Sequence, residues 1–175
     1  MEEGITMTVE EAIVTALQYE NKVRDHYLWA TSEAGDPQGR YFFEMLAKEE
    51  QGHVDYLESR LQQWRSEGKL KADPLQTVIP SPNFLADGLK MLKTSKEARD
   101  YSDDYKRLFT ALKLEEEVSV FYKGLVDTLE NPEAKAMFGR FLEIEDGHTA
   151  IVQAEVDVLT KTGFFYDFQE YNLEE

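Results

Sequence analysis

Apolar residues recur at three- and four-residue spacing along most of the chain, and strict alternation of apolar with polar residues is nearly absent. The first spacing places apolar side chains on one face of an α-helix, whereas alternation would indicate a strand. The pattern therefore predicts an all-α protein with four long helices. Their expected extents are residues 9–35, 37–68, about 101–130 and 132–162.

Three of these segments begin with a recognisable helix-start signal. Thr8 and Glu11 have the three-residue spacing of a capping box. The second and fourth segments begin at Asp36-Pro37 and Asn131-Pro132, in each case a capping side chain followed by proline at the first helical position. These signals support the predicted helix starts independently of the apolar spacing.

The connection between the second and third segments differs in character from the rest of the chain. Residues 69–100 contain Pro74, Pro80 and Pro82 and are too many for a tight turn. We expect a crossover here, carrying one short amphipathic helix around residues 84–92. Two helices joined by a short loop, a long connection and two more helices predict an antiparallel four-helix bundle with one crossover.

The chain also contains an internal repeat. A shift of 95 residues without a gap superposes the second pair of segments on the first, so the chain is predicted to be a duplicated helical hairpin. Identical residues coincide at Ala16 and Ala111, Leu17 and Leu112, Glu20 and Glu115, Val23 and Val118, Tyr27 and Tyr122, Pro37 and Pro132, Phe43 and Phe138, Glu50 and Glu145, Gly52 and Gly147, and His53 and His148.

The 175 residues correspond to one domain of ordinary size. We expect the bundle to occupy residues 1–162 and to be followed by an aromatic, acidic tail at residues 163–175. The tail has five aromatic side chains, which we expect to pack on the bundle or on a second subunit, since exposed they would form an adhesive patch. A docking peptide for a partner is the alternative.

The composition excludes several function classes. A formal net charge of -16 opposes binding to nucleic acid or to an anionic membrane surface. No run approaches the roughly 18 apolar residues that would span a bilayer, and the acidic start predicts a cytoplasmic protein. The absence of Cys excludes disulfides, thiolate metal sites and a cysteine nucleophile. Any metal must therefore be held by carboxylate, imidazole or carbonyl groups.

Four glutamates interrupt the apolar stripes, one on each predicted helix. They are Glu20, Glu50, Glu115 and Glu145. Four unpaired carboxylates buried together would be strongly destabilising. Two divalent cations would neutralise them, because four positive charges would then meet four negative ones.

Two histidines complete this candidate metal site. His53 follows Glu50 by three residues, and His148 follows Glu145 by three residues. Side chains at i and i+3 project from the same helical face, so each pair can converge on one metal pair. A Glu from each of two helices and a Glu-x-x-His from each of the other two is the known ligand pattern of dinuclear carboxylate bundles.

These residues resemble the ferritin-like superfamily and, within it, the rubrerythrin-type proteins, over about residues 8–160. The resemblance implies a di-iron site with an oxygen bridge, in which Glu50 and Glu145 bridge the metals. It implies two terminal ligand pairs, Glu20 with His53 and Glu115 with His148. Oxygen-rich ligation with one imidazole per metal favours Fe, with Mn also possible.

The chain departs from the rubrerythrin pattern in two places. It lacks the cysteines of a rubredoxin domain, so the electrons are expected from an external donor, either a rubredoxin-like protein or another reductant. Rubrerythrins also carry an additional glutamate one turn away on the third helix. Here the one-turn neighbours of Glu115 are Ala111, Leu112, Val118 and Ser119.

Several residues near the predicted ligands need a separate interpretation. Tyr27 and Tyr122 lie on the same stripes as the glutamates, where they are expected to hydrogen-bond the ligands or to carry electrons, with a purely structural role as the alternative. Helical register places His26 away from the site. The flanking glutamates are expected to face solvent as ordinary charges of a bundle surface; they are Glu49, Glu116 and Glu117.

The resemblance implies an oxidoreductase that acts as a di-iron peroxidase or oxidase. It would reduce hydrogen peroxide or dioxygen to water, and in the peroxide reaction each Fe(II) would give one electron. The alternative is a ferroxidase that oxidises Fe(II) for storage or detoxification, which would require a multi-subunit shell. A metal-free structural bundle would leave four core carboxylates unpaired. We expect a homodimer, and the long crossover allows helix pairs to swap between subunits.

Overall fold

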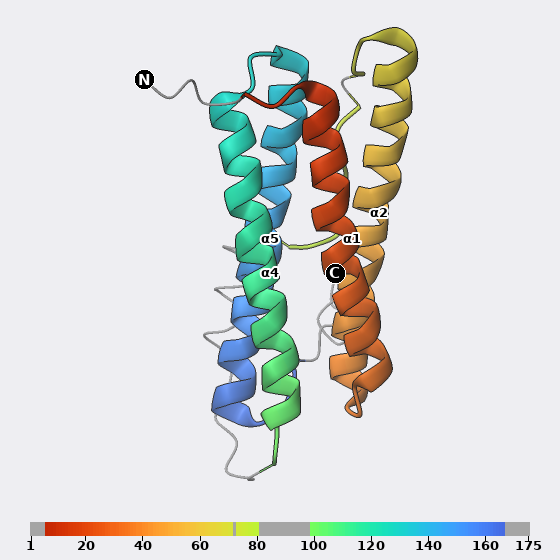
Figure 1. Ribbon diagram of the computed structural model, residues 1–175. Helices are drawn as coiled ribbons and strands as arrows, with labels where there is room; N and C mark the ends of the chain where they lie inside the picture. The colour runs from red at the N-terminus through yellow and green to blue at the C-terminus, as the bar shows by residue number, and fades with distance from the viewer. Residues whose placement is uncertain (1–5, 72, 81–98, 167–175) are drawn as a thin grey trace.

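The computed structural model describes residues 6–71, 73–80 and 99–166. Four long α-helices contain most of these residues, and no strand occurs among them (Figure 1). The helices are α1 (Val9–Glu33), α2 (Pro37–Glu67), α4 (Ser102–Thr128) and α5 (Pro132–Thr162). The prediction of an all-α fold with four helices is therefore confirmed.

The helix starts follow the capping signals of the sequence. The Thr8 hydroxyl accepts the backbone N–H of Glu11 at 3.2 Å, and the Glu11 carboxylate accepts the backbone N–H of Thr8 at 2.8 Å. The Asp36 carboxylate accepts the N–H groups of Gln38 and Gly39. Asn131 caps α5 in the same way through its side-chain oxygen. Each cap satisfies backbone donors that the first turn leaves without a helical partner.

The helices pair as two antiparallel hairpins, α1 with α2 and α4 with α5 (Figure 1). Helix α1 also lies beside α4, and these two run in opposite directions. Helices α2 and α4 run in the same direction, which requires the chain to return along the length of the bundle between them. This is the predicted bundle with one crossover between its second and third long helices.

The crossover is described only in part. Residues 73–80 contain no helix, and Leu75 is buried against the bundle. The short amphipathic helix predicted around residues 84–92 lies outside the described residues.

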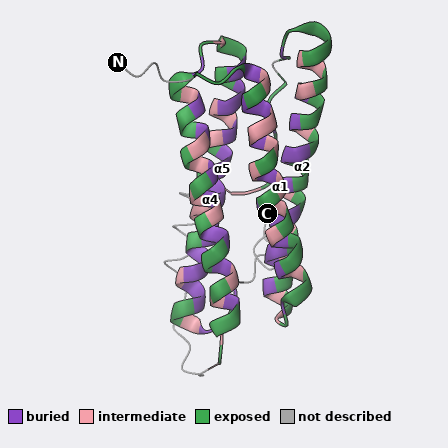
Figure 2. Cartoon of the chain, viewed as in Figure 1, coloured by how far each residue is buried: buried purple, intermediate pink, exposed green. Residues whose placement is uncertain are grey.

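The apolar stripes of the four helices form one continuous core, and the buried residues line the facing sides of the helices (Figure 2). Aromatic rings form the largest fully buried side chains. They are Tyr27, Phe42, Phe43, Tyr122, Phe138 and Phe141. Each such ring contributes about 1.5–3 kcal/mol of hydrophobic stabilisation, so this aromatic core holds the two hairpins together.

The two halves also end alike. Gly68 and Gly163, which are 95 residues apart, follow α2 and α5 in the left-handed conformation, with φ of 65° and 80°. Glycine adopts this conformation without a steric penalty. Two residues further on, Leu70 and Phe165 fold back and are buried in the core. The duplication thus extends beyond the helices.

Two described residues of the aromatic tail, Tyr166 and Phe165, pack against the bundle core, and Phe165 is the more deeply buried. Its ring centroid lies 5.8 Å from that of Phe43 and 6.4 Å from that of Phe42, both on α2. Phe164 is 38% exposed. Residues 167–175 lie outside the described residues, so the prediction for the remainder of the tail is not tested.

Candidate metal centre

The four glutamates and two histidines singled out in the sequence lie together in the middle of the bundle, and none is more than 1% exposed. They form two groups of four whose ligand atoms lie within 4.8 Å of one another, and a third group at the same separation joins His53 and His148 to Glu49. Glu50 and Glu145 belong to both groups of four. The first group is Glu20, Glu50, His53 and Glu145, and the second is Glu50, Glu115, Glu145 and His148.

The histidines direct the same ring nitrogen at these carboxylates. His53 Nδ1 lies 3.0 Å from Glu145, 3.1 Å from Glu20 and 3.3 Å from Glu50. His148 Nδ1 lies 2.8 Å from Glu50, 3.5 Å from Glu145 and 3.8 Å from Glu115. The two rings stack with centroids 5.2 Å apart and an interplanar angle of 8°. The arrangement follows from the Glu-x-x-His spacing, which places each pair one turn apart on one helix face.

The tyrosine hydroxyls bond across the two halves. Tyr27 on α1 donates to Glu115 on α4, and Tyr122 on α4 donates to Glu20 on α1. Because α1 and α4 are antiparallel neighbours, a residue two turns past one glutamate lies level with the other. Each hydroxyl therefore serves the glutamate of the opposite half rather than that of its own helix.

Burial and neighbouring charges shift the pKa values of the clustered glutamates in opposite directions. Burial and the nearby carboxylates Glu50 and Glu145 raise the pKa of Glu20 and of Glu115 well above the ordinary value. The pKa of Glu50 is lowered despite burial, because the two imidazoles stabilise the ionised carboxylate. Burial and the surrounding carboxylates likewise raise the pKa of Tyr27.

The cluster has the unsatisfied atoms expected of a metal site. Both carboxylate oxygens of Glu50 and both of Glu145 are buried without a hydrogen-bond partner among the described residues. In the same part of the chain, the only ion-pair partners of the four glutamates are the two histidines. A divalent cation between shared carboxylates would supply the partner that these oxygens lack, so the residues fit a metal pair.

One prediction about the flanking glutamates is wrong. The side chain of Glu49 is only 10% exposed and lies 3.6 Å from His148 Nε2. It accepts a hydrogen bond from the Thr77 hydroxyl at 2.5 Å and one from the Val78 backbone N–H at 3.1 Å. Helix periodicity alone could not show this, because the covering residues come from the crossover, for which the sequence predicted no packing.

The other flanking residues lie as predicted. The side chains of Glu116 and Glu117 are 45% and 54% exposed and pair with Lys113 and Lys22. His26 belongs to neither ligand group and places its Nε2 3.0 Å from the carbonyl oxygen of Arg107, on the neighbouring helix α4. Burial lowers the pKa of His26.

The glycines Gly52 and Gly147 of the two Glu-x-x-His motifs are not required by close packing. A Cβ atom built on either would meet no heavy atom within 4 Å. Close approach of a neighbouring helix therefore does not explain either glycine.

The comparison with protein families agrees with this geometry. The family model described as a ferritin-like domain matches residues 10–157, a range that contains all six clustered residues and both tyrosines. The chain belongs to the ferritin-like family. Comparison with curated proteins and with solved structures gave no match. None of the described helices of this ferritin-like chain is both long enough and apolar enough to cross a membrane.

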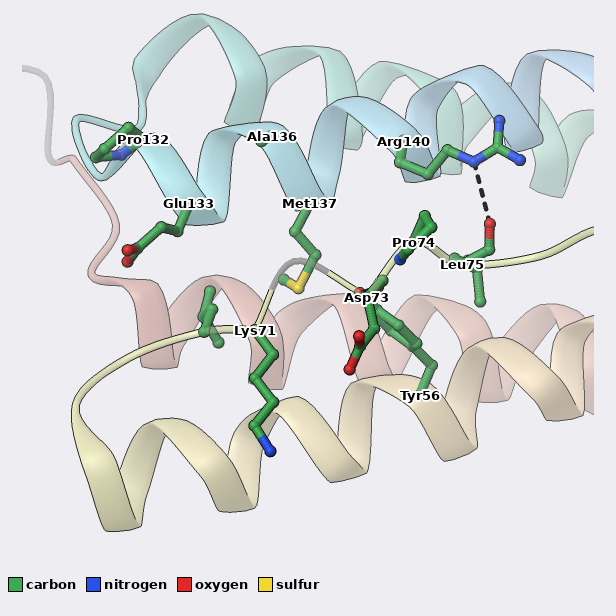
Figure 3. A pocket seen from close by; sticks show the side chains of 11 residues that line it. Tyr56, Lys71, Asp73, Pro74, Leu75, Pro132, Glu133, Ala136, Met137 and Arg140 are labelled. Atoms are coloured by element: carbon green, nitrogen blue, oxygen red, sulfur yellow. Dashed lines mark hydrogen bonds between the residues drawn. The ribbon is translucent and has the colours of Figure 1, made fainter.

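A separate pocket of about 330 Å³ lies where the segment after α2 meets the start of α5 (Figure 3). Arg140 donates to the carbonyl oxygen of Leu75 at 3.1 Å and Tyr56 donates to that of Asp73 at 2.7 Å, which fixes the segment along one wall. No lining residue belongs to the carboxylate–histidine cluster. The pocket is therefore distinct from the candidate metal centre.

Proposed function

We propose that this ferritin-like protein is a di-iron oxidoreductase that reduces hydrogen peroxide or dioxygen to water with electrons from an external donor. The observation that supports it is the pair of buried ligand groups that share Glu50 and Glu145. A metal pair with shared carboxylates suits chemistry that needs two electrons at one place.

The donor set favours iron. Each group offers three carboxylates and one imidazole, a set typical of Fe or Mn rather than of soft-ligand metals. Glu20 with His53 and Glu115 with His148 would hold one metal each, and Glu50 and Glu145 would contribute to both positions. Bound there, two Fe(II) ions would supply the two electrons that, with two protons, convert hydrogen peroxide to two waters.

The protein's own residues would prepare the site for this reaction. The buried hydroxyls of Tyr27 and Tyr122 hold a proton beside Glu115 and Glu20 and fix the orientation of each carboxylate. The ring of Phe141 packs against His53 and Tyr122, with centroids 5.5 Å and 5.1 Å away. This aromatic wall restricts water, which strengthens every electrostatic interaction inside the site.

The electron donor in this proposal is a separate molecule, because a chain without cysteine has no thiolate centre of its own. A rubredoxin-like protein or a small reductant would fill this role. The proposal also includes a homodimer, in which the long crossover allows the hairpins to pair within or between subunits.

Metal content is the first test of the proposal. Elemental analysis of protein purified without added metal, and again after anaerobic Fe(II) loading, is expected to show about two Fe per chain, as the two ligand groups require. The variant E50A/E145A removes both shared ligands and is expected to lose this iron. The variant E116A/E117A removes two exposed carboxylates and serves as the matched control. No transition metal in the wild type after loading would overturn the proposal.

Kinetics and assembly distinguish peroxide reduction from iron storage. Stopped-flow mixing of the di-ferrous protein with peroxide is expected to show oxidation faster than that of free Fe(II). Light scattering is expected to give a dimer. Oxidation no faster than in solution would contradict the peroxidase, and a large shell that accumulates Fe(III) would instead support the ferroxidase.

A further inference from the structure

Glu49 breaks the two-fold repeat at the candidate metal centre. The ligand pairs and the tyrosines all match their counterparts 95 residues away, but the counterpart of Glu49 is Ile144. Ile144 is buried and apolar, whereas Glu49 is an acidic side chain with only 10% of its surface exposed. The repeat is therefore broken by one carboxylate, which lies within 4.8 Å of a ring nitrogen of each histidine and is nearer to His148, at 3.6 Å.

The carboxylate that breaks the repeat lies beside Nε2 of His148, the ring nitrogen that does not face the shared glutamates. With His148 Nδ1 facing the shared carboxylates, its Nε2 faces the carboxylate of Glu49 at 3.6 Å. Glu50, Glu115 and Glu145 approach this histidine through its Nδ1 instead. The Nε2 atoms of His53 and His148 are both buried without a hydrogen-bond partner among the described residues, and only that of His148 has the Glu49 carboxylate within 4 Å.

Glu49 is itself held in place from outside the helix. The Thr77 hydroxyl donates to one carboxylate oxygen, and the backbone N–H of Val78 donates to the other. The Thr77 hydroxyl also accepts the backbone N–H of Ile79 at 3.1 Å, which restrains it in turn. The carboxylate is thus fixed on both oxygens, and its free lone pairs remain available to His148.

We propose that Glu49 is a positioning residue for His148. Its carboxylate faces Nε2 at 3.6 Å and would accept the N–H there when a metal held with Glu50, Glu115 and Glu145 takes the Nδ1 lone pair. Metal-binding histidines usually donate their other ring N–H to a carboxylate or carbonyl, which fixes the tautomer and makes the ligand more basic. Ile144 accepts no hydrogen bond, and Glu49 lies nearer to His148 than to His53, so His53 has less of this support. The two metal positions, which rest on the proposed function, are therefore unequal.

Binding measurements on the full chain test this inequality without any activity assay. Anaerobic titration of the metal-free protein with Co(II), followed by calorimetry and visible absorption, is expected to show two binding events of different affinity. The variant E49Q keeps the shape of the side chain but is a weaker acceptor. We expect it to weaken the tighter event about 10–100-fold and to change the weaker event much less. The variant E117Q removes an exposed charge and is expected to leave both events unchanged.

Variants that lack one of the two histidines show which metal position Glu49 affects. In H53A the remaining complete group contains His148, and adding E49Q is expected to weaken Co(II) binding and to alter its visible absorption. In H148A the remaining group contains His53, from which Glu49 lies farther, and adding E49Q is expected to change both properties much less. A residue that merely stabilised the fold would affect both backgrounds alike.

The outcomes separate the two proposals. Two Co(II) bound with E49Q unchanged, or with both events weakened equally, would overturn the role of Glu49 and leave the metal pair intact. A third Co(II) equivalent that E49Q removes would also overturn it, because Glu49 would then be a ligand. No Co(II) binding by the wild type would overturn the metal pair itself. If E49Q does not fold, T77V removes the anchoring hydroxyl and is expected to weaken the same event by a smaller factor.

Discussion

The hydroxyls of Tyr27 and Tyr122 each restrain the orientation of one carboxylate that we propose as a metal ligand. Each donates to one oxygen of a glutamate on the opposite half, Glu115 or Glu20. The second oxygen of Glu20 lies 3.1 Å from His53 Nδ1, and the second oxygen of Glu115 has no hydrogen-bond partner among the described residues. One oxygen of each terminal glutamate is thus restrained, and the other faces the place where a metal would lie.

Glu155 is a buried acid outside the metal cluster and gives a pH-dependent prediction. Burial raises the pKa of Glu155 to about 8, although the backbone N–H of Tyr166 stabilises the ionised form. Asp36, which is paired with Arg99, adds to the rise through repulsion. Between pH 4.5 and 8 the folded protein therefore binds a proton that the unfolded chain has released, so stability falls as pH rises.

The variant E155Q removes this proton linkage. At pH 5.5 its free energy of unfolding is expected to be close to that of the wild type, which is then protonated at this position. By pH 8.5 the variant is expected to gain about 3 kcal/mol relative to the wild type, at about 1.4 kcal/mol per pH unit. Urea unfolding at both pH values measures this, with the exposed Glu133→Gln as control. An equal difference at both pH values would contradict the expectation.

The sequence identifies a site residue when its position depends on helix periodicity, and fails to do so when its position depends on contacts with distant segments. The six clustered residues were identifiable because helix periodicity and the 95-residue repeat specify their faces without knowledge of the tertiary structure. The contacts of Glu49 and Glu155 depend on Thr77 and Tyr166, which reach them from segments beyond the helix ends. The partners of the tyrosines depend on the axial alignment of α1 against α4. Each of these is a tertiary relation that no local spacing encodes.

At the scale of elements, the two hairpins differ in what closes their ends. Phe165 fills the crevice beside Gly39, Phe42 and Phe43 on α2. Its counterpart Leu70 is smaller, and the pocket of about 330 Å³ lies beside it at the start of α5. Phe165 therefore packs closely against the start of α2, whereas Leu70 leaves a pocket at the start of α5.

This difference predicts that G39A changes the free energy of unfolding in opposite directions with and without the Phe165 ring. A Cβ atom on Gly39 would lie 2.6 Å from the ring of Phe165, so G39A is expected to destabilise the wild type by about 1–3 kcal/mol. In the F165A background the ring is absent, and G39A is expected to stabilise by up to about 1 kcal/mol through helix propensity. Thermal unfolding of the four proteins measures this coupling.

Gly139 on α5 provides the control, because a Cβ atom there would meet no heavy atom within 4 Å. The variant G139A is expected to stabilise both backgrounds alike. If G39A had the same sign with and without the Phe165 ring, the ring would not be what excludes a side chain at that position.

At the scale of the whole molecule, neither hairpin contains a complete ligand group. The first group takes Glu20, Glu50 and His53 from the α1–α2 hairpin but Glu145 from α5, and the second needs Glu50 from α2. Metal bound at either position would therefore join the two hairpins, which apolar core contacts and the two tyrosine–glutamate hydrogen bonds also hold together. Binding to the folded state alone raises its stability by mass action.

Metal-linked stability is accordingly expected to depend on the shared ligands. With free Fe(II) at 100 times its dissociation constant, each occupied position adds about 2.7 kcal/mol, which for a chain of this size raises the melting temperature by about 5–10 °C. Anaerobic calorimetry with and without chelator measures the increment. It is expected to disappear in E50A/E145A, which cuts both groups, and to persist in E116A/E117A. An increment that survived the loss of both shared glutamates would mean that the metal joins the hairpins elsewhere.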